Sequence, residues 1–285
     1  MPSENSIAAS GATVPPASSR PLRRRVVSAL VLVPAALLAA VLGTPFWDAF
    51  VALFGTVMAW EWSRVCSGRS QPGLAGIILM TAVPAAIAAA AFGTYRAAFL
   101  ILFAGAAGTA IAARLGQVPA PGWQGLGVLY VGVPCIAIQW IRAGEAGLET
   151  LLWLLVLVWA VDTAAFLAGR RFGGPKLAPR ISPNKTWAGL GGGVLGAALV
   201  GLLAAVWLGS PSVWPLVAIS AGLGLVEQAG DLAESAVKRR FGVKDSSAVI
   251  PGHGGVLDRV DGLMAVAVAV AALSLAGSGS VLSWR

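Results

Sequence analysis

The sequence is poor in charged side chains. Only 11% of its 285 residues are charged and 57% are hydrophobic, whereas soluble domains carry about 25% charged residues. These charges are too few to cover the surface of a soluble protein, so a lipid bilayer must be the solvent for much of the chain. The composition therefore predicts an integral membrane protein and argues against soluble, multi-domain organisations.

Cysteine and histidine are also scarce. The two cysteines, Cys66 and Cys135, are too few for a thiolate metal cluster or a disulfide framework. The single histidine, His253, excludes sites that need two histidine ligands. The net charge of +8 would favour nucleic acid in a soluble protein. In a membrane protein it indicates cytoplasmic loops and anionic lipid, and we expect no nucleic-acid partner.

The apolar residues are grouped into runs that can cross a bilayer, since a spanning helix needs about 20 of them. The runs are 26–42, 46–63, 74–92, 96–114, 123–141, 148–169, 187–208, 211–229 and 262–279. The second is the weakest because it contains Asp48 and Glu61. The sequence thus predicts an all-α, polytopic membrane protein with about nine transmembrane helices.

The basic residues predict the orientation. With the N-terminus in the cytoplasm, the inner segments hold all of the 20 Lys and Arg residues except Arg96, Arg142 and Arg285. This distribution follows the positive-inside rule. We therefore expect the long charged segments to face the cytoplasm.

The predicted organisation has three parts. Residues 1–25 form a disordered, basic N-terminal tail, residues 26–145 form N-terminal transmembrane helices, and residues 146–285 form a C-terminal transmembrane catalytic region. Two long charged cytosolic loops are expected in the last part, at 170–186 and 230–261.

The chain has 12 carboxylates, and they are unevenly placed. Asp162 lies inside an apolar run, where ionisable groups are costly and usually functional. Glu227, Asp231 and Glu234 have spacings that put them on one helix face, which Lys238 extends. Six carboxylates fall within a short C-terminal stretch: Glu227, Asp231, Glu234, Asp245, Asp258 and Asp261.

Three of these carboxylates are candidate metal ligands. Asp258 and Asp261 are three residues apart and share a face if helical. Mg²⁺ prefers few carboxylates together with waters and substrate phosphates. The two acidic faces, one with Asp231 and one with Asp258 and Asp261, could therefore hold a hard divalent cation. The alternative is that these groups are solvated charges or interhelical salt bridges.

Basic residues accompany the acidic ones. Arg and Lys beside carboxylates suit a phosphate chain that carries its metal, and glycines around His253 allow close backbone approach to a ligand. In the other charged segment, Lys185 precedes a helix whose N-terminus can bind an anion, capped by Ser182 or Asn184. The alternative there is a simple positive-inside anchor. Glycines from Gly189 to Gly193 indicate close helix packing or close approach to a ligand.

These residues resemble a known family. The stretch Ser235-Ala-Val-Lys-Arg-Arg-Phe-Gly-Val-Lys-Asp245, followed by Pro251-Gly-His-Gly-Gly-Val-Leu-Asp-Arg-Val-Asp261, is similar to the signature of phosphatidate cytidylyltransferases (CDP-diacylglycerol synthases). Upstream segments also fit: Asp162, Gly169-Arg170, Ser182–Gly189, Gly230-Asp231-Leu232 and Glu234. Ala188 departs from the glutamate that many members carry, which weakens any role for a carboxylate there.

The resemblance implies the reaction of CTP with phosphatidic acid to give CDP-diacylglycerol and pyrophosphate. It implies Mg²⁺ on Asp231, Asp258 and Asp261, with the binding of a second cation left open. It also implies a bacterial-type inner (cell) membrane as the bilayer, with the active site facing the cytoplasm, and is compatible with a homodimer. The catalytic residues it implies are Asp231, Lys238, Arg239, His253, Asp258 and Asp261. The substrate-binding residues are Arg170, Lys185, Ser235, Lys244, Asp245 and Arg259.

Two other functions compete with this hypothesis. A CTP-dependent polyprenol or phytol kinase would have a related charged region and would transfer the γ-phosphate. An ion-coupled transporter would use Asp162, Glu227 and Asp231 as an ion path, but it would usually show repeats or broken helices, and the sequence shows neither.

Overall fold

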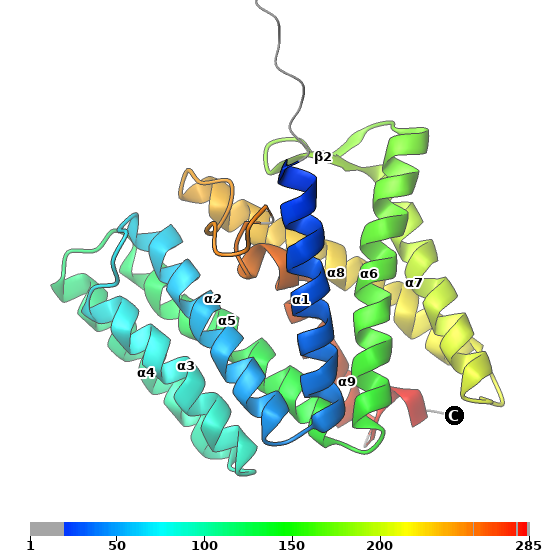
Figure 1. Ribbon diagram of the computed structural model, residues 1–285, viewed down its shortest axis with the longest axis horizontal. Helices are drawn as coiled ribbons and strands as arrows, with labels where there is room; N and C mark the ends of the chain where they lie inside the picture. Colours follow the sequence, from blue (N-terminus) through cyan, green and yellow to red (C-terminus); the bar gives the residue numbers. More distant parts are fainter. Residues whose placement is uncertain (1–19, 253, 278, 284–285) are drawn as a thin grey trace, which may run out of the picture.

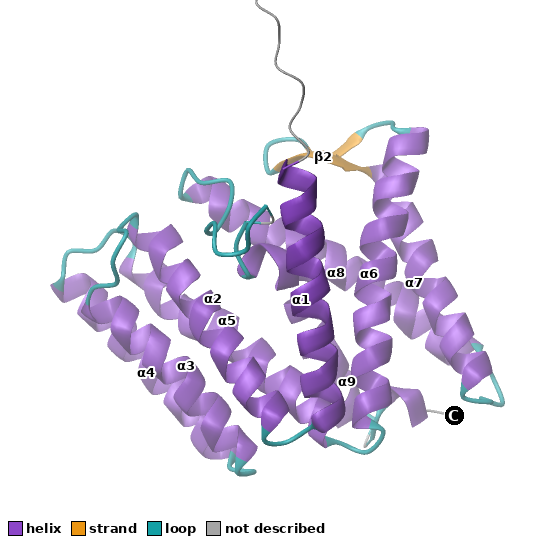
Figure 2. Ribbon diagram, in the orientation of Figure 1, coloured by secondary structure: helices purple, strands orange, loops and turns teal. Residues whose placement is uncertain are grey.

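The computed structural model describes residues 20–252, 254–277 and 279–283. Nine α-helices account for most of this part of the chain, which confirms the all-α membrane architecture (Figure 1, Figure 2). The helices are α1 (Arg20–Leu42), α2 (Phe46–Ser67), α3 (Leu74–Ala91), α4 (Tyr95–Leu115), α5 (Pro121–Ala143), α6 (Gly147–Phe172), α7 (Trp187–Trp207), α8 (Trp214–Arg240) and α9 (Leu257–Ala276).

Two small elements complete the described chain. Strand β1 (Lys176–Ala178) pairs antiparallel with β2 (Ser182–Thr186), and a short 3₁₀ helix, η1 (Val281–Ser283), follows α9. Seven helices, α3 to α9, are long and apolar enough to cross a membrane. Helix α1 has a shorter apolar part, Leu30–Leu42, and α2 carries charges at both ends.

Several helices extend beyond the apolar runs. Helix α8 continues through the charged residues to Arg240, and α6 continues to Phe172. Apolarity marks where lipid ends, whereas Arg, Lys and Glu are good helix formers that carry a helix on into water. The loops predicted at 170–186 and 230–261 are therefore shorter: a hairpin connection from 173 to 186, and a loop at 241–256. Likewise α1 begins at Arg20, inside the predicted tail 1–25. Residues 1–19 of that tail are not among the described residues.

The helices pack around two hydrophobic cores that share α5, α6 and α9. One core is built mainly by α2 to α5 and also contains Val256, Leu257 and Met264 from the C-terminal part. The other is built by α6 to α9 and contains Ala137 and Ile141 from α5. Figure 1 shows α1 crossing in front of the boundary between these two groups. The hairpin, the 241–256 loop and the start of α1 lie at one end of the molecule.

Helices α6 and α7 approach closely because one face of α7 is lined by glycines. A Cβ on Gly192 would lie 2.3 Å from the Ala168 Cβ and 2.9 Å from the Ala164 carbonyl oxygen, and Gly196 has a similar contact with Ala164. A Cβ added at Gly191 would meet nothing within 4 Å, so this position faces away from α6. The packing interpretation of these glycines is thus confirmed for Gly192.

We expect Gly192→Ala to destabilise the protein, because the added methyl group forces the two helix backbones apart. Overpacking of this kind costs about 1–3 kcal/mol. The matched control is Gly191→Ala, which should be neutral or slightly stabilising because alanine favours helix. Thermal unfolding in detergent measures both variants, and equal unfolding temperatures would contradict the packing argument.

Candidate functional site

The predicted acidic face of α8 is confirmed, and it points inward toward α6 and α9. Glu227 and Glu234 are only 2% and 3% exposed. Asp231 lies between them, one helical turn from each. Buried charges are usually paired or bind ions, so their partners show how the site is organised.

Lys185 links the hairpin to this acidic face. Its Nζ lies 2.6 Å from an Asp231 carboxylate oxygen and donates to Gln228 Oε1 at 2.9 Å. Lys185 is the residue before the end of β2, and β2 leads directly into α7. Thr186 Oγ1 caps the first turn of α7 by accepting the Gly189 N–H. The expectation that Ser182 or Asn184 caps this helix is wrong, because the helix begins only at Trp187.

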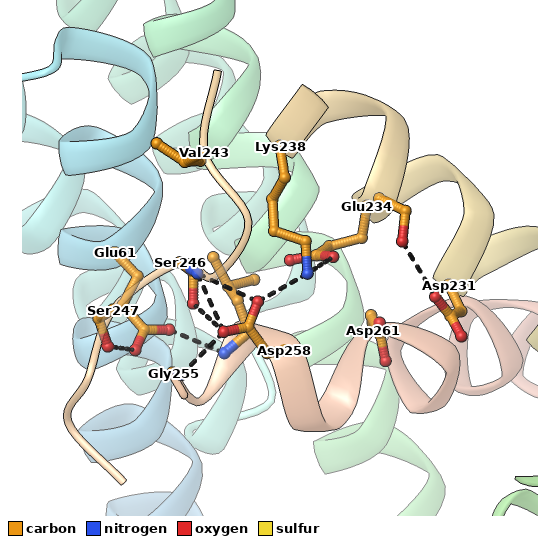
Figure 3. A network of polar contacts seen from close by, with 12 residues as sticks. Glu61, Asp231, Glu234, Lys238, Val243, Ser246, Ser247, Gly255, Asp258 and Asp261 are labelled. Atoms are coloured by element: carbon orange, nitrogen blue, oxygen red, sulfur yellow. Dashed lines mark hydrogen bonds and ion pairs between the residues drawn. The ribbon is translucent and has the colours of Figure 1, made fainter. Parts of the chain in front are cut away.

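Lys238 joins α8 to α9. Its Nζ lies 2.5 Å from a Glu234 oxygen, one turn earlier on α8, and 2.8 Å from Asp258 Oδ1 at the start of α9 (Figure 3). Both carboxylate side chains are almost fully buried, and the single Lys238 ammonium group bridges them. Lys238 is therefore held in place before any ligand binds.

Asp258 anchors the 241–256 loop. Its carboxylate accepts the backbone N–H groups of Ser246 and Gly255 at 2.9 and 2.8 Å, and also the Ser246 hydroxyl at 3.1 Å (Figure 3). Gly255 is required here, because a Cβ would lie 2.0 Å from Ser246 Oγ. With Lys238 on Oδ1, both oxygens of Asp258 have protein donors in this conformation.

Glu61 anchors the site structurally, and the sequence interpretation missed this role. It comes from the end of α2, is fully buried, and accepts the backbone N–H groups of Val256 and Leu257 at 2.9 and 2.8 Å. It also accepts the Ser247 hydroxyl at 2.6 Å (Figure 3). Glu61 thus satisfies the first N–H groups of α9, where a negative charge is favourable, and it ties α2 to the loop.

Asp261 lies one turn after Asp258 and faces Asp231 across the α8–α9 contact (Figure 3). Asp231 and Asp162 both repel it electrostatically, while its Oδ1 accepts the Gly262 N–H at 2.9 Å. Together with neighbouring groups these residues form what we call the acidic cluster. Its members are Asp162, Glu227, Asp231, Glu234, Asp258 and Asp261.

The acidic cluster contains more carboxyl groups than basic side chains. Three basic residues interact with its six carboxyl groups: Lys185, Lys238 and Arg259. Acidic side chains within membrane helices usually pair with one another or mark ion sites. No three acidic, cysteine or histidine side chains of the described chain are arranged as a closed metal cage. Mg²⁺ needs only one or two carboxylates beside waters and phosphates, and Asp231 and Asp261 fit that requirement.

The remaining predicted residues lie around this centre. Ser235 Oγ donates to Asp231 Oδ1 at 3.3 Å. Arg239 is exposed and donates to the Val243 and Ile181 carbonyl oxygens, so it connects the end of α8 to the hairpin turn. Lys244 and Asp245 are exposed on the loop.

Arg170 and Arg259 are also exposed, on the last turn of α6 and the first turn of α9 respectively. The prediction for His253 falls outside the described residues.

Comparison with known proteins supports the resemblance. The chain is 39% identical over 252 residues to the phosphatidate cytidylyltransferase of Brucella suis biovar 1 (strain 1330), covering 86% of this chain and 90% of that protein. It is 34% identical to the Pseudomonas aeruginosa (strain PAO1) enzyme of the same name, covering 88% and 96%. The corresponding Haemophilus influenzae enzyme is 32% identical, covering 86% and 95%.

The match to the family extends over both groups of helices. Residues 23–276 match the cytidylyltransferase family, a range that includes α2, with Glu61, as well as the hairpin, α8, the 241–256 loop and α9. The residues that build the acidic cluster and its anchors all fall within it. This chain therefore belongs to the cytidylyltransferase family.

Proposed function

We propose that the protein transfers the cytidylyl group of CTP to phosphatidic acid, giving CDP-diacylglycerol and pyrophosphate. The observation that carries this proposal is the acidic cluster itself, in which two ion-paired lysines and a larger number of carboxyl groups meet at the boundary between membrane helices and charged loops. A water-soluble nucleotide and a bilayer-bound phosphate can both reach such a place. The family relationship supports the same activity.

The chemistry needs little proton transfer. A phosphate monoester has its second pKa near 6, so phosphatidic acid is already anionic and nucleophilic at neutral pH. One of its phosphate oxygens forms a bond to the α-phosphorus of CTP, and the bond from that phosphorus to the β-phosphate bridging oxygen breaks. Pyrophosphate leaves with the bonding electron pair. The main barrier is the approach of two anions, which positioning and positive charge reduce.

Residues of this chain would supply both the positioning and the positive charge. Lys185 and Lys238, held by their carboxylate partners, would offer ammonium groups to the phosphates, as would the exposed Arg170, Arg239, Lys244 and Arg259. Asp231 and Asp261 would hold Mg²⁺, which when bound neutralises the triphosphate and stabilises the leaving pyrophosphate. Asp258 would join them if its Oδ1 exchanged Lys238 for the ion.

The location of the site follows from the substrates. Because CTP is a cytosolic solute, we place the hairpin, the 241–256 loop and the N-terminus on the cytoplasmic side of an inner membrane. The clustering of Lys and Arg in these segments supports that orientation. A homodimer stays a prediction of the family resemblance.

Labelled CTP tests the proposal directly. With the purified protein in mixed micelles of phosphatidic acid and a polyprenol, with MgCl₂, CTP labelled at the α-phosphate should transfer its label to lipid. CTP labelled at the γ-phosphate should release its label as pyrophosphate. A kinase acting on a lipid alcohol would give the opposite result, with γ-label in lipid and CDP released. Such a result, or no transfer of either label with any phosphatidic acid, would contradict the proposed reaction.

A further inference from the structure

An apolar cavity of about 480 Å³ lies beside the acidic cluster. Helices α1, α2, α5, α6 and α9 surround it, with side chains such as Leu32, Ala36, Phe54 and Leu263 in its walls. Cavities of this size hold small-molecule ligands in proteins. The charged residues in its described lining are Asp162 and Arg259.

Those two residues connect the cavity to the proposed reaction centre. Asp162 belongs to the acidic cluster and interacts with both Asp231 and Arg259. Arg259 lies between Asp258 and Asp261 in the sequence and is exposed. The cavity is therefore apolar along most of its length and charged where it meets the cluster, which matches an amphipathic anion with a hydrocarbon chain.

Helix α1 forms one wall of this cavity. Leu32 and Ala36, one turn apart, face the cavity, whereas Leu30 and Leu38 are 68% and 59% exposed on the outer side. Helix α1 also contacts the 241–256 loop, because Ser28 Oγ donates to the Pro251 carbonyl oxygen at 3.2 Å. The same helix thus forms a wall of the cavity and contacts the loop that Asp258 anchors.

We propose that one acyl chain of phosphatidic acid occupies this cavity while its phosphate lies near Arg259. This inference rests on the proposed function. Lipid tails are as apolar as leucine, so entering the cavity from the bilayer gains little hydrophobic free energy. The cavity would instead orient the lipid, so that its phosphate oxygen reaches the α-phosphorus of CTP, an effect on rate more than on affinity.

Filling the cavity tests the inference. Ala36→Phe places a ring inside it, and Ala35→Phe, on the exposed neighbouring position outside the lining, is the matched control. In detergent micelles with saturating CTP, Ala36→Phe should lower the turnover of dipalmitoyl phosphatidic acid roughly tenfold or more. Turnover of dioctanoyl phosphatidic acid, whose chains are shorter, should fall much less. Ala35→Phe should match the parent with both.

Each outcome has a distinct meaning. Equal turnover by Ala36→Phe and Ala35→Phe, or an equal loss with both chain lengths, would overturn the acyl-chain assignment. Failure of the parent protein to form any CDP-diacylglycerol would instead overturn the proposed function. A second measurement does not depend on a variant that folds. Phosphatidic acid with a photoreactive diazirine in mid-chain should label peptides of α1 and α9 in the parent protein, and labelling confined to lipid-exposed α3 and α4 would contradict the cavity.

Discussion

With asparagine in place of Asp261, cytidylyl transfer is expected to fall roughly 10²–10³-fold, the loss typical when one electrostatic contact to the reacting groups is removed. The fold should survive. The asparagine carbonyl oxygen can still accept the Gly262 N–H, and the substitution removes a charge that Asp231 repels. The unfolding temperature in metal-free buffer should therefore stay the same or rise.

Opposite changes in activity and stability separate this prediction from simple misfolding. MgCl₂ should raise the unfolding temperature of the parent more than that of Asp261→Asn, because ligands that bind only the folded state stabilise it. The exposed Glu145→Gln serves as control and should resemble the parent in both measurements. If Asp261→Asn kept near-parental transfer, the proposed role of Asp261 in holding Mg²⁺ would be wrong.

Glu61→Ala is expected to have the second large effect, this time on both folding and activity. It leaves the buried N–H groups of Val256 and Leu257 without an acceptor and removes the negative charge at the start of α9. Each unsatisfied buried group costs about 1–3 kcal/mol, so the unfolding temperature should fall clearly. The 241–256 loop should also loosen, and trypsin should cut after Lys244 faster than in the parent.

The exposed Glu145→Ala is the matched control for this change and should leave both measurements near the parental values. Glu61→Gln refines the test, because its amide keeps one acceptor but presents an N–H donor where the carboxylate accepted. It should recover part of the stability and less than full transfer activity. Tryptic cleavage at an unchanged rate in Glu61→Ala would show that Glu61 does not hold the loop.

The sequence predicted the parts of the site that depend on local spacing. The acidic face of α8 follows from the intervals between Glu227, Asp231 and Glu234, because helix periodicity continues beyond the apolar run. Lys238 was placed correctly on that face, but one of its two ion pairs is with Asp258, which is 20 residues away. Charge composition indicated a basic residue beside acids and could not indicate which of them it would bind.

The role of Glu61 could not be predicted from the sequence. Its partners lie 195 and 196 residues later, and a single acidic residue at the end of the weakest apolar run looks like ordinary interfacial charge. Periodicity carries no information about contacts between distant helices. The length of α8 was missed for a related reason, because lipid exposure and helix formation end at different residues.

The hydrogen bonds between Glu61 and the start of α9 also limit how far this enzyme can be shortened. A fragment from residue 146 onward would contain every residue of the signature and most of one hydrophobic core, yet nothing to receive the N–H groups of Val256 and Leu257. The signature segment therefore depends on a residue outside it and could not simply be grafted onto another set of membrane helices. A shortened form of this chain would have to keep α2 or supply an equivalent acceptor.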